Sequence, residues 1–375
     1  METRPLVESN TAFALDLYRE VKATDGNLFC SPFSISAALA MTFAGARGDT
    51  AAQMARTLHF DPPHDAIPAA FAQLRAGLAT LEESGRVRLM LANALWPQAG
   101  YGFLNEFLAL VREHFHASVT AVDYTAWEAA ADAINAWVSD QTDSMIGNLI
   151  APERLNALTR LVLVNAVYFQ GLWEYPFPRE STKSAPFETG TGETADVPMM
   201  SRRGDFAYGE RESLQILELP YAGDRLSMVV FLPGNRNALA DLESSLTVDT
   251  VNRWMASTRR REVDVYLPRF RIEGHFSLES TLKALGMRDA FDMDRADFSG
   301  MDGRERWLYI SAAFHQAVVD VHEEGTEAAG AAAVIMAVRS PIQPTKFRAD
   351  HPFVFLIRDN ETGSLLFLGR LVDPR

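Results

Sequence analysis

The sequence is poor in the features that define several common protein classes. It contains one cysteine, Cys30, so no intramolecular disulfide can form. Cys30 lies in an apolar run, which predicts a buried small hydrophobic side chain rather than a reactive thiol. No apolar window is long enough to span a bilayer. The sequence therefore indicates neither a disulfide scaffold nor a membrane anchor.

A signal peptide is also missing from the chain as given. Its first residues, Met1–Pro5, lack a basic region followed by an apolar stretch. We therefore expect a cytoplasmic protein, or an extracellular one if a signal has been removed.

Positive charge is scarce, and the formal net charge is −14. This balance argues against a nucleic-acid or membrane-surface partner. The basic clusters Arg202-Arg203 and Arg259–Arg261 are interpreted as solvated turns or helix ends, although the second leaves a weak case for a polyanion site. The helical segment Ala69–Glu83 carries only Arg75 as a cation, so heparin-type activation through that segment is not expected.

Catalytic motifs are absent as well. The chain has no Gly-x-Ser-x-Gly, no His-Glu-x-x-His and no phosphate loop that ends in Gly-Lys-Ser/Thr. No set of nucleophile, base and metal ligands emerges. We therefore expect a protein that is not an enzyme and that needs no cofactor or metal.

What the chain does contain predicts one α+β domain over residues 1–375. No Pro/Gly/Ser-rich linker, charge block or repeat divides it, and 47% of its residues are hydrophobic. Apolar residues at helical spacing dominate the first half, over residues 8–22, from Ser31/Pro32 onward, and over Ala69–Glu83, Leu104–Phe115 and Thr125–Thr142. β-branched and aromatic runs dominate the second half, at Leu161–Phe169, Leu214–Pro220, Leu226–Leu232, Glu262–Phe270 and Phe314–Val321.

The most informative segment follows the last of these runs. Between Glu324 and Arg339 the only charged residue is Glu327, and most of the others are small or aliphatic. Read as a strand, one face carries no charge: Thr326, Ala328, Gly330, Ala332, Val334 and Met336. Alanine also favours helices, so a short helix or a linker is the alternative. Strand-like runs on both sides, the second at Phe347–Ile357, favour a segment that can enter a sheet.

At this point the chain resembles the serpin family over residues 8–373. The resemblance is carried by motifs that occur in the family's order: Asn27–Ile35, Gly45–Thr50, Leu163–Trp173, Ala296–Met301, the hinge Glu323–Ala331 and the segment Phe347–Ile357. It implies a single-domain serpin fold with about nine helices, three β-sheets and an exposed reactive-centre loop at about residues 323–345. We expect a monomer.

The resemblance also implies a mechanism and its residues. The hinge would comprise Glu323, Glu324, Gly325, Thr326, Glu327, Ala328, Ala329 and Gly330. The family's spacing places the scissile bond at Arg339-Ser340, a bait for a trypsin-like serine protease. If the scissile bond lies one residue earlier, the bait is Val338 and the target is an elastase-like protease or a cysteine protease. The cleaved loop would insert into the central sheet and hold the protease as a covalent 1:1 complex.

Two clusters match the family's machinery for sheet opening. Ser31, Ser34, Asn165 and His315 match a polar cluster, the shutter, beneath the opening strands. Trp173 matches the tryptophan at the top of the sheet, the breach. There Arg269 is expected to face Glu323 and restrain the hinge before cleavage.

Three alternatives to inhibition stay open. A non-inhibitory serpin uses the same fold, but such members tend to carry bulky, charged or proline residues in the hinge. A slow hydrolase would need a nucleophile set that the sequence lacks. A plain protease substrate needs the same bait and is not separated from an inhibitor by sequence.

Overall fold

The structure is a computed structural model that describes residues 3–61, 63–82, 85–325 and 345–375. The expected hinge residues Thr326–Gly330 and the expected bait residues Val338, Arg339 and Ser340 lie outside these ranges. Within them, no helix is both long enough and apolar enough to cross a membrane.

Helices prevail in the first part of the described chain and strands in the second. The α-helices are α1 (Arg4–Val21), α2 (Pro32–Gly45), α3 (Gly48–Thr57), α4 (Ile67–Glu82), α5 (Asn105–Leu110), α6 (Trp127–Gln141), α7 (Leu239–Ser245), α8 (Val248–Ser257), α9 (Leu278–Ala284) and α10 (Ser299–Asp302). The first seven strands are β1 (Leu28–Cys30), β2 (Val87–Pro97), β3 (Ser118–Val119), β4 (Leu161–Gly171), β5 (Lys183–Glu188), β6 (Thr194–Arg211) and β7 (Leu214–Pro220). The others are β8 (Leu226–Pro233), β9 (Arg259–Pro268), β10 (Phe270–Ser277), β11 (Ala312–Val321), β12 (Thr345–Arg348), β13 (Phe353–Asp359) and β14 (Leu365–Leu371).

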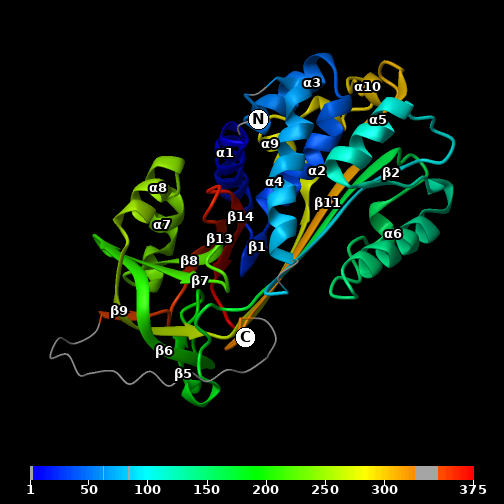
Figure 1. The fold of residues 1–375 in the computed structure, drawn as a ribbon. Coiled ribbons are helices and arrows are strands. Elements are labelled where there is room, and N and C mark those ends of the chain that lie inside the picture. Colours follow the sequence, from blue (N-terminus) through cyan, green and yellow to red (C-terminus); the bar gives the residue numbers. More distant parts are fainter. Residues whose placement is uncertain (1–2, 62, 83–84, 326–344) are drawn as a thin grey trace.

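A five-stranded sheet forms the centre of the molecule, in the order β10-β11-β4-β2-β3. In Figure 1 its long strands β2 and β11 run diagonally, from the region of α5 and α10 toward the C-terminus. The neighbours β4 and β11 are parallel, with Ala312 beside Val162 and Val319 beside Phe169. Each of them is antiparallel to its other long neighbour, β2 or β10. The two middle strands therefore meet in the less favourable parallel arrangement.

The second sheet has nine strands, in the order β1-β14-β13-β8-β7-β6-β9-β12, with β5 beside β6. The α+β class predicted from the sequence is confirmed. The expected three sheets, however, appear as two hydrogen-bonded sheets in the described residues. The reason is β6, whose 18 residues pair with β5 near one end and β7 near the other, and with β9 between. This long strand joins what would otherwise be two sheets.

Most predicted elements form near their expected bounds. The second helix begins as predicted, because the Ser31 hydroxyl accepts a hydrogen bond from the Ser34 backbone N–H and Pro32 occupies the first turn. Two predicted strands are divided. Glu262–Phe270 spans the end of β9 and the start of β10, which belong to different sheets. Phe347–Ile357 is interrupted before Phe353, since Pro352 has no N–H to donate to a ladder.

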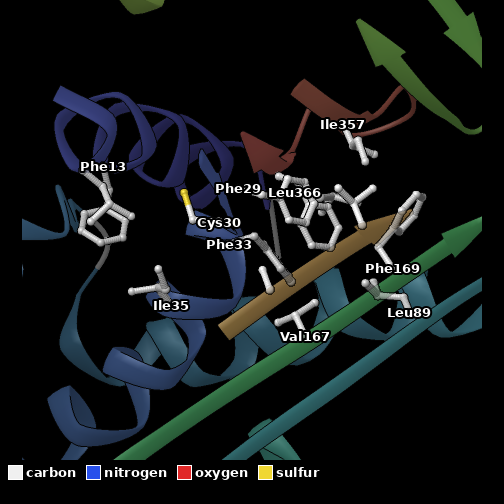
Figure 2. Packing of buried hydrophobic residues seen from close by; sticks show 14 of the residues in the cluster. Phe13, Phe29, Cys30, Phe33, Ile35, Leu89, Val167, Phe169, Ile357 and Leu366 are labelled. Atoms are coloured by element: carbon white, nitrogen blue, oxygen red, sulfur yellow. The ribbon is translucent and has the colours of Figure 1, made fainter. Parts of the chain in front are cut away.

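Apolar side chains pack on both faces of the five-stranded sheet. Along β2 the residues alternate: Leu89 and Leu95 belong to the large cluster under α1 and α2, whereas Ala92 and Trp96 belong to a smaller cluster with α6. Figure 2 shows Phe29, Phe33 and Leu366 gathered above this sheet beside Val167 and Phe169. Aromatic rings link the two sheets, since Phe367 of β14 lies 5.1 Å from Phe29 and 5.3 Å from Phe169 between ring centroids. Cys30 is buried as predicted, and burial raises the pKa of its thiol to about 12.

The two sheets approach each other closely at a glycine. A Cβ atom on Gly274 of β10 would lie 1.8 Å from the carbonyl oxygen of Phe29 in β1, which is far inside van der Waals contact. The obstructing atom belongs to the backbone, so a side-chain rotation cannot relieve the clash. This crossing requires glycine because of space rather than because of backbone dihedral angles.

We predict that Gly274→Ala lowers the free energy of unfolding by at least about 2 kcal/mol, because β1 and β10 must move apart. Chemical denaturation measures the change. Gly102→Ala is the matched control, since a Cβ there would meet no heavy atom within 4 Å. Equal stability of the two variants would show that the sheets separate without cost.

Candidate functional site

The described part of the hinge begins where β11 ends. After Val321 the chain makes a tight turn in which His322 and Gly325 pair as an antiparallel bridge. The His322 N–H donates to the Gly325 carbonyl at 3.3 Å, and the Gly325 N–H donates to the His322 carbonyl at 3.1 Å. The turn sets Gly325 against the end of β4.

Glycine is required at the last described residue of this turn. Gly325 has φ of +105°, a conformation that other residues rarely adopt. A Cβ on it would also lie 2.1 Å from the carbonyl oxygen of Gly171 and 2.6 Å from the backbone nitrogen of Trp173. The hinge therefore rests directly on the backbone at the end of β4.

Trp173 holds the turn with both its backbone and its ring. Its indole N–H donates to the His322 carbonyl at 2.9 Å, and its backbone N–H donates to the Glu324 carbonyl at 3.0 Å. The ring is 3% exposed and stacks on Tyr221, with centroids 4.5 Å apart. The structure thus brings Trp173 to the hinge, where the sequence placed it.

Glu323 is the buried carboxylate of the hinge, and its side chain is 8% exposed. One of its oxygens accepts a hydrogen bond from the Thr182 hydroxyl at 2.7 Å. The other lies 3.6 Å from Nε of Arg269, whose side chain is 51% exposed. The ion pair expected from the sequence is therefore present, but Thr182 makes the shorter contact.

Glu324 points to a different cation, Arg179. The guanidinium donates to the Glu324 carboxylate, and this hydrogen bond is the main reason that the pKa of Glu324 lies below its ordinary value. Nδ1 of His322 lies 3.4 Å from the same carboxylate. The two hinge glutamates are thus bound separately, Glu323 by Thr182 and Arg269 and Glu324 by Arg179 and His322.

The polar cluster predicted from the sequence assembles at the junction of β4 and β11. His315 and Asn165 face each other across the two strands, and Nδ1 of His315 contacts Oδ1 of Asn165. The Asn165 amide donates to the Ser34 hydroxyl at 2.6 Å, and the Ser31 backbone N–H donates to Nε2 of His315 at 3.0 Å. The start of α2 is therefore hydrogen-bonded to both strands.

This geometry fixes the protonation state of His315. A backbone N–H can only donate, so Nε2 must be the unprotonated nitrogen and Nδ1 must carry the hydrogen that Asn165 accepts. The ring is completely buried, and burial, with a smaller contribution from His275, lowers the pKa of His315 to about 3. The cluster holds a neutral imidazole.

Sequence reasoning missed three members of these clusters. Asn93 of β2 accepts a hydrogen bond from the Asn165 amide and extends the polar cluster to a third strand. The sequence does mark Asn93, because the alternation of side chains from Val87 to Pro97 places this one polar residue on an otherwise apolar face of the strand. Arg179 and Thr182 had no such signal, since they lie in a short connection whose path depends on the tertiary fold.

The basic clusters lie on strands rather than at turns or helix ends, which corrects the interpretation made from sequence. Arg202 and Arg203 belong to β6 and Arg259–Arg261 to β9, its neighbour. Arg203 binds Asp264 through two hydrogen bonds of 2.5 and 2.9 Å, and the Arg261 guanidinium lies 5.4 Å from the centre of the Tyr208 ring. Two of these cations, Arg203 and Arg261, therefore bind side chains of the same sheet.

Comparison with known proteins places these features in a family. The family described as Serpin (serine protease inhibitor) matches residues 8–374. A leukocyte elastase inhibitor of Bos taurus is 44% identical over 98% of this chain and 99% of its own length. Serpin48 of Tenebrio molitor, described as highly specific, superposes with a TM-score of 0.89 at 33% identity over the whole of both chains. Uncleaved ovalbumin superposes with a TM-score of 0.88, also at 33% identity, over 98% of this chain and 99% of its own.

We predict that His315 makes stability depend on pH. Its folded pKa lies below the ordinary value of 6.5, so the unfolded chain takes up the proton first as pH falls. The contribution to stability is therefore complete above about pH 6.5 and falls between pH 6.5 and 3, by at most about 1.4 kcal/mol per pH unit. Denaturant unfolding between pH 7.5 and 5 measures this slope. His315→Asn should flatten it, and equal slopes in the two proteins would contradict the prediction.

We also predict that loss of Arg269 lowers the free energy of unfolding less than loss of the Glu323 carboxylate, which binds both Arg269 and Thr182. Arg269→Gln should cost less than about 1 kcal/mol, because the arginine is half exposed. Glu323→Ala should cost about 1–3 kcal/mol, because it removes the acceptor of Thr182 as well. Urea unfolding of both variants measures the difference. A larger loss for Arg269→Gln would make the ion pair the principal restraint.

Proposed function

The chain belongs to the serpin family of serine protease inhibitors, and on that basis we propose that it traps a trypsin-like serine protease as a suicide substrate. It is a protease inhibitor rather than an enzyme. The observation that carries the proposal is the hinge at Gly325, which leaves β11 and rests on the end of β4 while those two strands are still paired with each other. A sheet in which β4 and β11 are paired directly can still accept one more strand between them.

The trap begins with ordinary proteolysis at Arg339-Ser340. The Asp at the base of a trypsin-like specificity pocket selects the Arg339 side chain. The protease serine oxygen then attacks the Arg339 carbonyl carbon, and the bond to the nitrogen of Ser340 breaks. The protease histidine, which took the serine proton, returns it to the departing amine of Ser340. The protease is left as an ester on Arg339.

Cleavage frees the segment Thr326–Val338 to enter the sheet between β4 and β11. The new strand would be antiparallel to both, and so would replace one parallel pairing by two antiparallel ones. Its backbone N–H and C=O groups would exchange water for strand partners while its uncharged face becomes buried. Thirteen residues at about 3.3 Å each carry the attached protease about 40 Å. Distortion of the protease there would stop deacylation.

The polar cluster is the part of the sheet that this movement must break. Since His315 and Asn165 bond directly across β4 and β11, a strand can enter only after they separate. Ser31 and Ser34 bind one strand each, so they can retain those bonds while the strands move apart. We assign the cluster the role of a latch that delays insertion until the loop is cut.

An elastase-like target is the second candidate. Proteins named leukocyte elastase inhibitor are 40–44% identical to this chain, and a reactive bond one residue earlier would present Val338. Arginine does not fit the small pocket of an elastase. The two candidates therefore differ in which residue forms the ester.

We predict that trypsin forms an adduct with this protein that survives denaturing electrophoresis, together with a released peptide that begins at Ser340. Arg339→Ala should abolish the adduct with trypsin and leave the fold intact. If elastase gives the stable adduct and the peptide begins at Arg339, then Val338 is the bait.

Cleavage at Arg339 without an adduct would contradict trapping and indicate a plain substrate or a non-inhibitory serpin. Thr326→Arg provides a control within the hinge, because it places a charge on the face that must become buried. It should convert the inhibitor into a substrate without changing the cleavage site.

A further inference from the structure

One row of side chains near the hinge end of the five-stranded sheet is polar, and three of its four members are charged. Arg271 of β10 pairs with Asp320 of β11, and Arg88 of β2 pairs with Gln170 of β4. The β4–β11 register sets Asp320 beside Gln170. Residues paired in this way share one face of the sheet. The row therefore crosses the sheet in the order Arg271, Asp320, Gln170, Arg88, and we call it the charged row.

Arg271 lies between two carboxylates. Its guanidinium donates to one carboxylate oxygen of Glu273 at 2.7 and 3.1 Å. Another guanidinium nitrogen lies 3.9 Å from a carboxylate oxygen of Asp320. The side chains of Arg271 and Asp320 are 42% and 38% exposed, so both can change rotamer without disturbing the core. Arg271 therefore interacts with two carboxylates already and is free to turn toward a third.

The hinge turn fixes which residues would face each other if the segment after it entered the sheet. His322 pairs with Gly325 in an antiparallel bridge. Continuing this pairing by two residues along each strand would bring Glu327 opposite Asp320. Glu327 is the only charged residue in the segment Thr326–Val338, so it is the only charge that insertion would carry onto the sheet.

The contact with β4 gives the same position independently. The Trp173 N–H donates to the Glu324 carbonyl, as in an antiparallel pair. Continuing from there by three residues along each strand would bring Glu327 opposite Gln170. Since Gln170 already lies beside Asp320, the two registers agree, and Glu327 would enter the charged row between them.

The inserted strand would set the Glu327 carboxylate directly against that of Asp320. Like charges that face each other across two strands destabilise a sheet. The neighbour on the other side of Glu327 is neutral, so relief must come from a cation one strand further away, Arg271 or Arg88. Arg88 contacts Asp143, whereas Arg271 already contacts Asp320, which is one of the two carboxylates. Arg271 is therefore the better placed cation.

We propose that Arg271 is the counter-ion that receives Glu327, and so is a positioning residue for loop insertion. The inference rests on the proposed function and deepens it. Neighbouring strands lie about 4.8 Å apart, so the Cα atoms of Arg271 and Glu327 would lie about 10 Å apart, which the two long side chains span together. One guanidinium has enough N–H groups to bind the carboxylates of Glu327 and Asp320 at once. It would convert a repulsive pair of acids into a bridged one.

This contact would act early in insertion. Glu327 is the second residue after Gly325, so it would reach the sheet before the apolar residues that follow it. A repulsive contact at this point would delay every later pair, because the strand grows from the hinge. Slower insertion would leave the ester on Arg339 exposed to hydrolysis for longer, and more of the inhibitor would be consumed as a substrate.

A synthetic peptide tests the contact without a protease. It has the sequence of Thr326–Val338, is labelled with fluorescein, and is made with and without the change Glu327→Gln. Its entry into the uncut protein is followed by gel filtration. The unchanged peptide should enter Arg271→Gln about twofold to fivefold more slowly than the original protein. The Glu327→Gln peptide should enter both proteins at the same rate.

Arg88→Gln is the matched control, because Arg88 lies at the other end of the charged row. Both peptides should enter it at the original rate. Equal entry of the unchanged peptide into Arg271→Gln and the original protein would overturn the inference, and so would equal slowing in Arg88→Gln. Failure of both peptides to enter the original protein would instead count against the sheet opening that the proposed function requires, and against this inference with it.

The full chain gives a second measurement. Arg271→Gln should raise the number of inhibitor molecules consumed for each trypsin molecule trapped, and the double variant Arg271→Gln/Glu327→Gln should restore the original number. Damage to the fold would not be repaired by a change at Glu327. A loss that persists in the double variant would therefore overturn the role assigned to Arg271.

Discussion

The parallel contact between β4 and β11 is the interaction on which the rest of this structure depends. It joins two strands that are antiparallel to their outer neighbours, and it is closed by a direct bond between His315 and Asn165. The start of α2 binds both strands through Ser31 and Ser34. A buried neutral imidazole is well suited to this position, because it donates from one nitrogen and accepts at the other without carrying charge into the core.

The hinge is held by contacts of very different kinds. Gly325 lies so close to the backbone at the end of β4 that no side chain fits. Glu323 is buried and hydrogen-bonded, whereas Arg179 and Arg269 reach the two glutamates from more exposed positions. The steric contact and the buried hydrogen bond define where the turn lies, while the outer ion pairs add less because water competes with them.

The sequence could predict elements whose signal is local. The start of the second helix at Ser31/Pro32 and the strands β7 and β11 were predicted near their observed places, whereas the polar cluster was predicted from the resemblance to the family. The division of Glu262–Phe270 between two sheets was not, because a single apolar run carries no mark of where the chain changes layer. Thr182 and Arg179 could not be predicted either, since what brings them to the hinge is the path of a connection through space.

The His322–Gly325 bridge and the bond from the Trp173 N–H to the Glu324 carbonyl agree with the register that sets Ala312 beside Val162, and this has a kinetic consequence for the proposed insertion. A strand that starts from the His322–Gly325 bridge lengthens by adding neighbouring pairs, as a hairpin does, and each added residue closes only a minimal loop. Hairpins form in about 1–10 μs. Growth of the proposed strand would therefore need no search among registers, and its speed would be limited by how fast the sheet separates ahead of it.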